Sequence, residues 1–180
     1  DRSSAASDVY KRQAEETVFD PACGIGGTLI DLNTHVGELT LVGTDINPAP
    51  ATIAQLHAFL TDANATFTFA DSLAHDSYPE ETFNTVVCEP PLGASIEQDV
   101  AAKLVASSGL DIPAPRFSDA AFLIYVSTHL AADGRGYILT TVRTGFRRTL
   151  AQFRQTLVAQ GGLEAVIQLP AGLLSYSRVP

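Results

Sequence analysis

The stretch TVFDPACGIGG, residues Thr17–Gly27, decides the fold. A short β-prone run, Thr17–Phe19, ends at Asp20-Pro21, and the glycines that follow allow a tight turn. The residues after the turn, up to Val36, change to a helical pattern. A strand, a glycine-rich turn and a helix in this order predict the start of an alternating α/β fold.

The same alternation continues outward from this stretch. The sequence predicts further strands at Leu39–Thr44, Ala65–Phe69 and Phe83–Cys88, and a helix at Thr52–Asp62. Short, nearly continuous apolar strands separated by helices are typical of a mostly parallel sheet with helices on both faces. Beyond them we expect a long loop at Gly93–Arg116, and then alternating elements: helix Phe117–Ala131, strand Tyr137–Thr141, helix Thr149–Gln160 and strand Ala165–Gln168.

Composition narrows the class of protein. The 180 residues are 46% hydrophobic and 17% charged, which excludes a disordered chain or a coiled coil. No apolar run reaches the roughly 20 residues that span a bilayer, and no secretory signal opens the chain, so we expect a cytoplasmic protein without a membrane partner. The two cysteines form no disulfide framework and no zinc site, so no metal is predicted. A net charge of −9 argues against a stand-alone, non-specific nucleic-acid binder.

Four of the predicted strands end in an acidic residue: Asp20, Asp45, Asp71 and Glu89. In open parallel sheets, ligands bind outside the carboxyl ends of the strands. We therefore expect the four side chains to face one rim of the sheet.

The glycine loop fits neither of the common phosphate-binding patterns. Gly24 and Gly26 match the dinucleotide spacing, but Leu29 stands at its last glycine position, which disfavours a nicotinamide dehydrogenase. Asp20 would repel a phosphate and attract a cation, such as an ammonium group beside an adenosine. A tight turn without a ligand is the simpler alternative.

The other strand ends also have two interpretations each. Asp45 can accept hydrogen bonds from ribose hydroxyls or cap a helix, and Asp71-Ser72 can bind an exocyclic amine or form a turn. Glu89-Pro90-Pro91-Leu92 is a rigid strand terminator, or an acceptor pair for an amino group that must be made nucleophilic. Arg143, Arg147 and Arg148 form a basic cluster. We interpret it as the solvated start of a helix, and contact with phosphates is the less favoured alternative.

Taken together, these motifs resemble the N6-adenine DNA methyltransferases, and especially the modification subunit of type I restriction systems. DPACGIGG resembles the family's S-adenosylmethionine motif, LVGTDINP and FADSL its second and third strand ends, VVCEPPLG its catalytic motif, and GLEAVIQLPAGLL a late strand-and-loop segment. The resemblance implies a Rossmann-like S-adenosylmethionine-dependent methyltransferase fold. It implies a cofactor site at Asp20, Pro21, Ala22, Gly24, Gly26, Asp45, Ile46, Asp71 and Ser72, and catalytic residues Glu89, Pro90, Pro91 and Leu92.

Two residues depart from the family pattern. Glu89 stands where the family has Asn or Asp, and Leu92 stands where it has Tyr or Phe. Glu is one methylene longer, and Leu cannot stack on a base. Three alternatives therefore remain beside adenine methylation: an impaired cofactor-binding or scaffold subunit, and a methyltransferase of the same fold that acts on protein or on RNA.

The resemblance also sets the expected boundaries and partners. Residues 1–16 are read as a non-native or flexible arm, and residues 17–180 as a methyltransferase catalytic domain truncated at its C-terminus. Because the chain is acidic, DNA would be held by a missing recognition domain or a partner. The expected partners are a specificity subunit and a restriction subunit.

Overall fold

The computed structural model describes residues 16–74, 78 and 82–170, so the expected arm at 1–16 lies almost wholly outside the described residues. The chain divides into two compact units. The first, called the sheet unit, comprises residues 1–88 and 129–137, and the second, called the helical unit, comprises residues 89–128 and 138–180. Each unit is described by itself.

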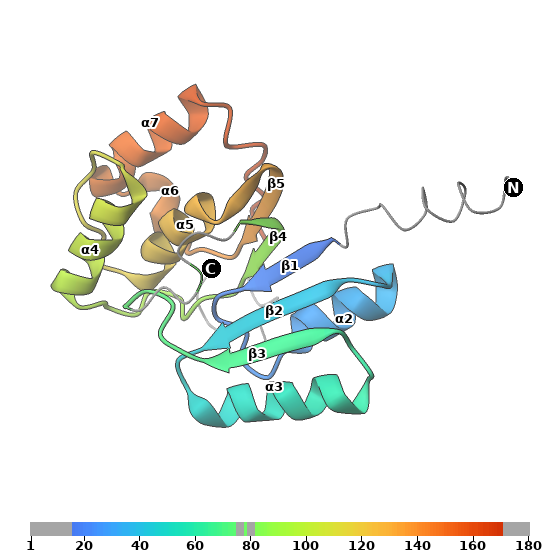
Figure 1. Ribbon diagram of the computed structural model, residues 1–180. Coiled ribbons are helices and arrows are strands. Elements are labelled where there is room, and N and C mark those ends of the chain that lie inside the picture. Colours follow the sequence, from blue (N-terminus) through green and yellow to red (C-terminus); the bar gives the residue numbers. More distant parts are fainter. Residues whose placement is uncertain (1–15, 75–77, 79–81, 171–180) are drawn as a thin grey trace, which may run out of the picture. The chain divides into compact units, whose positions relative to one another are not determined.

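The sheet unit contains five strands in the order β3-β2-β1-β4-β5 (Figure 1). They are β1 (Thr17–Asp20), β2 (Thr40–Asp45), β3 (Ala65–Phe69), β4 (Phe83–Cys88) and β5 (Leu130–Ile138). β1 pairs in parallel with both β2 and β4, and β2 pairs in parallel with β3. The order reverses beside β1, so the edge where ligands bind in open parallel sheets lies after β1 and β4.

Two helices cover one face of these strands. α2 (Gly27–Val36) contacts β1 and β2, α3 (Pro48–Leu60) contacts β2 and β3, and the two helices also contact each other. α3 begins four residues before the predicted start at Thr52. The Asn47 side chain accepts a hydrogen bond from the Ala49 N–H (3.2 Å), and Pro48 occupies the first helical position, where its missing N–H is not needed. Pro48 and Pro50 thus belong to the first turn of α3.

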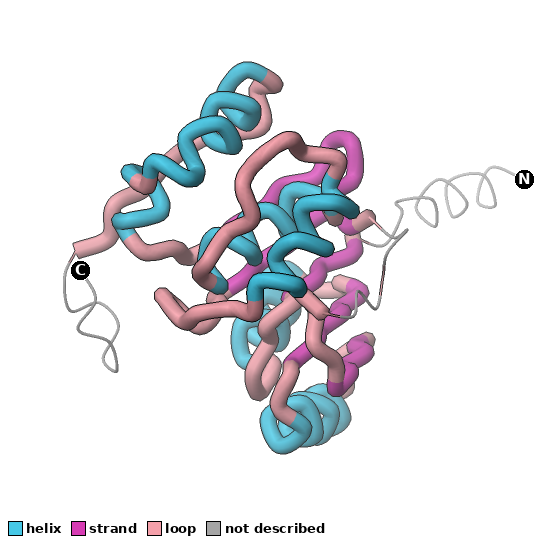
Figure 2. Tube along the Cα trace, turned by 90° about the vertical axis from the view of Figure 1, so that its left-hand side faces the viewer, coloured by secondary structure: helices cyan, strands magenta, loops and turns pink. Residues whose placement is uncertain are grey.

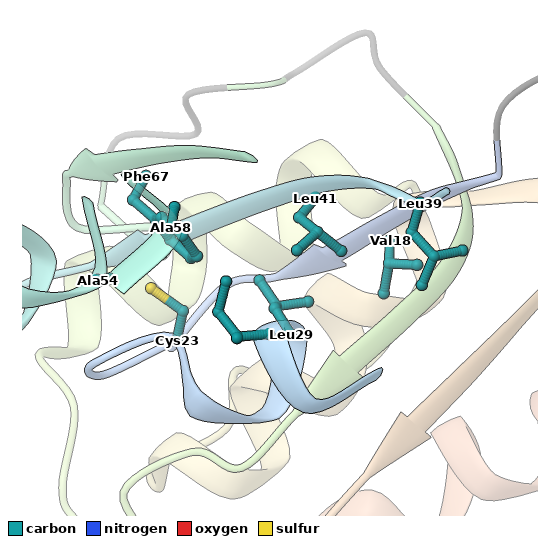
Figure 3. Packing of buried hydrophobic residues seen from close by; sticks show 9 residues of the cluster. Val18, Cys23, Leu29, Leu39, Leu41, Ala54, Ala58 and Phe67 are labelled. Carbon is teal, nitrogen blue, oxygen red and sulfur yellow. The ribbon is translucent and has the colours of Figure 1, made fainter. Parts of the chain in front are cut away.

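The core of the sheet unit lies between these helices and the strands (Figure 3). Leu29 from α2 and Leu41 from β2 are fully buried, and Phe67 from β3 is 4% exposed. Figure 3 shows Cys23 of the glycine loop near Ala54, Ala58 and Phe67. The loop is therefore part of the packed core, and its shape depends on these contacts.

β5, the last strand along the chain, is longer than predicted and begins earlier in the sequence. The helix predicted at Phe117–Ala131 ends at Thr128, and β5 occupies Leu130–Ile138 in place of Tyr137–Thr141. Gly134, a residue type common in turns, lies inside β5. An ideal Cβ at this position would lie 2.7 Å from the Phe83 carbonyl oxygen, so glycine permits close approach to β4.

The helical unit contains α4 (Gln98–Ser108), α5 (Ser118–Thr128), α6 (Val142–Phe146), a 3-10 turn η1 (Arg148–Leu150) and α7 (Ala151–Ala159). Helices are cyan in Figure 2. α4 lies within the segment predicted as a loop, and it packs on α5 through the buried residues Ala101 and Leu104. The loop prediction at Gly93–Arg116 was wrong because the two prolines of the segment were given more weight than the short apolar spacing of α4.

The strand predicted at Ala165–Gln168 is also absent from the described structure. Residues 163–170 have no regular secondary structure, and Val166 and Ile167 are 82% and 79% exposed. An apolar run becomes a strand only beside a partner strand, and none of the described strands pairs with this segment.

Candidate active site

The glycine loop begins at Asp20, the last residue of β1. Asp20 is only 4% exposed, and its Oδ1 accepts a hydrogen bond from the Ala22 N–H (2.9 Å). Pro21 is buried beside it, and the Cys23 N–H donates to the Thr44 carbonyl of β2 (2.9 Å). The turn predicted after β1 is therefore tied to the ends of β1 and β2.

Two glycines shape this loop for different reasons. Gly24 has φ +54°, and open space surrounds the position that a Cβ would take. Gly26 has φ +76°, and a Cβ there would lie 2.9 Å from the ring of Phe67. Gly24 is thus required by its backbone conformation, whereas Gly26 is required by both conformation and packing.

Asp45 lies at the end of β2 and holds the glycine loop directly. Its Oδ2 accepts a hydrogen bond from the Gly24 N–H (2.9 Å), and its Oδ1 accepts one from the Asn47 N–H (2.8 Å). Asp45 is half-buried, and Ile46 beside it is 65% exposed. The structure therefore brings together the predicted residues of the first two strand ends, with Ile46 at the surface.

Ser72 connects the third strand end to the same loop. Its hydroxyl donates to the Pro21 carbonyl (2.7 Å) and lies 2.6 Å from the Thr44 hydroxyl. Because the single Ser72 proton is engaged with Pro21, Thr44 is the donor in the second bond. Thr44 was not predicted as a site residue, although it directly precedes Asp45, the last residue of β2. Ser72 and Thr44 are both buried, so they support the glycine loop from the protein interior.

Asp71, by contrast, is half-buried and bonded locally. Its Oδ1 accepts hydrogen bonds from the Leu73 N–H (3.0 Å) and the Ala74 N–H (3.1 Å), which form the turn after β3. Asp71 therefore forms a turn, which is one of the two roles that the sequence suggested for it; the other was binding of an exocyclic amine.

The carboxylates make the loop electrostatically negative. Burial, followed by the charges of Asp20 and Asp45, raises the pKa of the Cys23 thiol to about 12. A neutral thiol is a poor nucleophile, so Cys23 serves packing. The part of the shift that comes from the charges of Asp20 and Asp45 indicates a negative potential that would favour a cation beside the loop.

The motif after β4 begins the helical unit. Glu89 and Pro91 are exposed, Pro90 is buried and Leu92 is half-buried. The Pro91 carbonyl accepts hydrogen bonds from the Ser118 hydroxyl and from the Ala94 N–H (3.4 Å). The first turn of α5 therefore holds the segment that follows the two prolines.

Ser118 also holds the next turn of this segment. Its N–H donates to the Ala94 carbonyl (2.9 Å), so the same residue binds the loop at two points. Nothing in the linear spacing showed that it would reach a residue 27 positions away.

Leu92 lines a cavity of about 480 Å³ within the helical unit. Leu123 of α5, Phe146 of α6 and Phe153 of α7 contribute to its wall, together with the irregular segment 163–170. Its volume and mostly apolar lining are typical of a site for a small organic group.

Solved structures with a similar backbone show which fold this chain has. A provisionally assigned class I S-adenosylmethionine-dependent methyltransferase from Listeria monocytogenes matches 86% of this chain and 48% of its own, with a TM-score of 0.65 and 16% identity. A chain of a type I restriction–modification system matches 80% of this chain and 32% of its own, with a TM-score of 0.66 and 20% identity. The fold is therefore the Rossmann-like α/β fold of these methyltransferases, as predicted.

The family follows from the sequence. The N-6 DNA Methylase model matches residues 3–180, and the chain belongs to this family. The match begins inside the segment expected to be a non-native arm, and the nature of residues 1–16 stays a prediction.

Two curated relatives are methylase subunits of type I restriction enzymes. That of MjaIX from Methanocaldococcus jannaschii is 20% identical over 178 residues, and that of MpnII from Mycoplasma pneumoniae is 26% identical over 193 aligned residues. The matches cover 91% and 95% of this chain but only 32% and 35% of the relatives. The chain thus spans about a third of the length of these relatives. Within the described residues, no helix is both long and apolar enough to cross a membrane.

Proposed function

We propose that this chain belongs to a DNA methyltransferase that transfers the methyl group of S-adenosylmethionine to the N6 amino group of adenine. The observation that carries the proposal is the glycine loop after β1, which Asp45 holds through Gly24 and which Asp20 flanks. Family membership supports the reaction class. Two carboxylates beside an open glycine suit a cationic ligand approaching the backbone.

The residues of this loop fit the cofactor. The negative charges of Asp20 and Asp45, which act on Cys23 in addition to its burial, suit a positive sulfonium, and the space beside Gly24 admits a ligand. Asp20, Pro21, Ala22, Gly24 and Gly26 would hold the methionine part. Asp45 and Ile46 would hold the ribose side, and Asp71 the adenine. When bound, S-adenosylmethionine supplies the activated methyl group.

The motif after β4 would prepare the target base. The exocyclic amine of adenine is a poor nucleophile because its lone pair is conjugated with the ring. The Glu89 carboxylate and the Pro90 carbonyl can both accept from this amine, which favours a tetrahedral nitrogen with an available lone pair. The hydrogen bonds that Ser118 makes to Pro91 and Ala94 limit motion of the adjacent backbone, and a well-placed acceptor pair contributes through orientation.

The cavity lined by Leu92 is the proposed site of the base, which must leave the duplex at a cost of a few kcal/mol. Leu92 offers apolar contact without the ring stacking that an aromatic residue would add, which is worth about 1–3 kcal/mol per base. We therefore expect weaker retention of the base than in a chain with an aromatic residue there.

Partners are inferred from the relatives, whose names describe subunits of type I restriction enzymes. We propose that DNA is recognised with a specificity subunit, and that a restriction subunit belongs to the same system. The net charge of −9 supports a partner that supplies most of the affinity for DNA.

Methylation mapping tests the proposal. The complete gene, with its neighbouring subunits, is expressed in a host that lacks adenine methylation, and N6-methyladenine is mapped by single-molecule sequencing. We expect one methylated motif, and its loss on Glu89→Ala. Glu97→Ala is the matched control, because Glu97 is an exposed acid whose side chain makes no cap hydrogen bond at α4.

A second candidate is a cofactor-binding scaffold without catalysis, which Glu89 and Leu92 favour. Methylation that is absent from the native chain but present in the Glu89→Asn, Leu92→Phe double variant would support this candidate. Methyl transfer from radiolabelled cofactor to protein or RNA, with none to DNA, would instead support another substrate for the same fold.

A further inference from the structure

The arginines of the helical unit are concentrated in one segment. Between Ile138 and Leu163 the sequence contains four arginines and neither lysine, aspartate nor glutamate, in a chain whose net charge is −9. The four are Arg143, Arg147, Arg148 and Arg154, and they lie on α6, η1, α7 and the residue between α6 and η1. The segment is thus a local reversal of charge.

Buried hydrogen bonds fix the start of this segment. Asp119 is fully buried at the start of α5, and its Oδ2 accepts hydrogen bonds from the hydroxyls of Thr141 (2.7 Å) and Thr144 (2.6 Å). Thr141 is the residue before α6, and Thr144 is in its middle. The orientation of α6 within the helical unit is therefore set by the core.

Two of the arginines hold the end of α6. Arg154 Nη1 donates to the carbonyls of Thr144 (3.1 Å) and Arg147 (2.9 Å). The Arg147 guanidinium lies 3.6 Å from the centre of the Phe117 ring. These contacts are to neutral groups, so they order the two side chains without neutralising their charge.

Arg143 and Arg148 differ from these two. Both are exposed, and neither side chain takes part in a hydrogen bond or ion pair with another described residue. Phe146 lies between them in sequence and is 80% exposed. Four arginines on an ordered segment, none of them in an ion pair with a described residue, and an exposed aromatic ring among them form a surface suited to a polyanion.

We propose that this arginine surface, made of Arg143, Phe146, Arg147 and Arg148, binds the phosphate backbone of double-stranded DNA. The choice of DNA rests on the proposed function. Guanidinium groups match phosphate oxygens in a bidentate geometry, and charge spread along an exposed turn suits a repeating anion better than one enclosed phosphate. The surface adds affinity that does not depend on base sequence, and Phe146 packs on the sugar and base edge beside the phosphates.

Salt dependence of DNA binding tests the proposal in the complete protein with its partner subunits. We compare the native complex with the Arg143→Gln, Arg148→Gln double variant by fluorescence anisotropy on a labelled duplex. Each lost phosphate contact should lower the magnitude of the slope of log K against log salt by about 0.9, and the double variant therefore by about 1.8. The loss should be equal on the methylated motif and on unrelated duplex.

Two further variants separate charge from folding. Lys103→Gln removes one exposed positive charge from α4 of the same unit and should leave the slope unchanged. Arg143→Lys with Arg148→Lys should restore most of the native slope. Phe146→Ala should weaken binding several-fold with no change of slope.

A double variant with the native slope would overturn the proposal, as would a slope that falls equally with Lys103→Gln. A change seen with duplex RNA but not with duplex DNA would also overturn it. If the native complex methylates DNA but the double variant keeps the native slope, the proposed function holds and the proposed role of the arginine surface is wrong. If the double variant has a reduced slope but the native complex methylates no DNA, the arginine surface holds and the proposed function is wrong.

Discussion

Cys23 lies at the point where the glycine loop meets the core, and its surroundings make it an indicator of native packing. Its pKa is raised to about 12 from the ordinary value of 9.0, first by burial and then by the charges of Asp20 and Asp45. The unfolded chain releases this proton near pH 9.0, whereas the native chain keeps it until about pH 12. Between those values the native state binds more protons than the unfolded state.

The free energy of unfolding should therefore fall as the pH rises above 9.0, by up to about 1.4 kcal/mol per pH unit from this group alone. Below that pH the contribution of Cys23 is constant. Urea unfolding on both sides of pH 9.0 should show a shallower alkaline decline in Cys23→Ala than in the native chain.

Gly24 and Gly26 offer a second comparison at single residues, because only one of them is crowded. Gly26→Ala places a methyl group 2.9 Å from the Phe67 ring and forces φ +76° on alanine, so we expect a destabilisation of about 2–4 kcal/mol. Gly24→Ala meets no atom within 4 Å and should cost about 1 kcal/mol for its conformation alone. Equal losses of unfolding free energy would show that packing against Phe67 does not determine the loop.

At the scale of the elements, helix α5 begins with a fully buried carboxylate, Asp119. Burial on its own raises the pKa of Asp119, but hydrogen bonds from the side chains of Thr144 and Thr141 and from the backbone outweigh it. The pKa therefore lies below its ordinary value of 3.8. The resulting stability is complete above that pH and is lost as the pH falls through the depressed native pKa.

Asp119→Asn should lower the free energy of unfolding at neutral pH by about 2 kcal/mol, because it replaces charge-assisted hydrogen bonds by neutral ones. The variant should also show a smaller further loss on acidification than the native chain. Asp99→Asn, on the exposed first turn of α4, is the matched control and should change stability little. Thermal unfolding of the three proteins at neutral and acidic pH would reveal either result.

Elements whose pattern is local were predicted well, and elements that depend on a partner were not. β3 and β4 have the predicted boundaries, because short apolar runs between turn residues admit few alternatives. β5 was misplaced because Gly134 is typical of a turn unless a neighbouring strand approaches its backbone. α4 has a weak apolar spacing that becomes decisive only when α5 packs on it.

At the scale of the whole molecule, the acidic strand ends were predictable and the contacts beneath them were not. Asp20 and Asp45 could be assigned to one site because parallel strands bring their carboxyl ends to one edge. The roles of Thr44 and Ser118 could not be read from sequence, since each depends on a hydrogen bond to a residue distant in the chain. Linear spacing reveals the acidic residues at strand ends more readily than the groups that support them.

The bonds among Thr44, Ser72 and Pro21 have a consequence for the way this protein can diverge. Three strand ends contribute to one chain of hydrogen bonds, and each hydroxyl has a single proton to give. A substitution at Ser72 that cannot donate leaves the Pro21 carbonyl unmatched and removes the acceptor that Thr44 uses. Tolerated substitutions at these two positions should therefore occur together. A library that randomises Thr44 and Ser72 together should yield folded variants with residue combinations that neither single-site library contains.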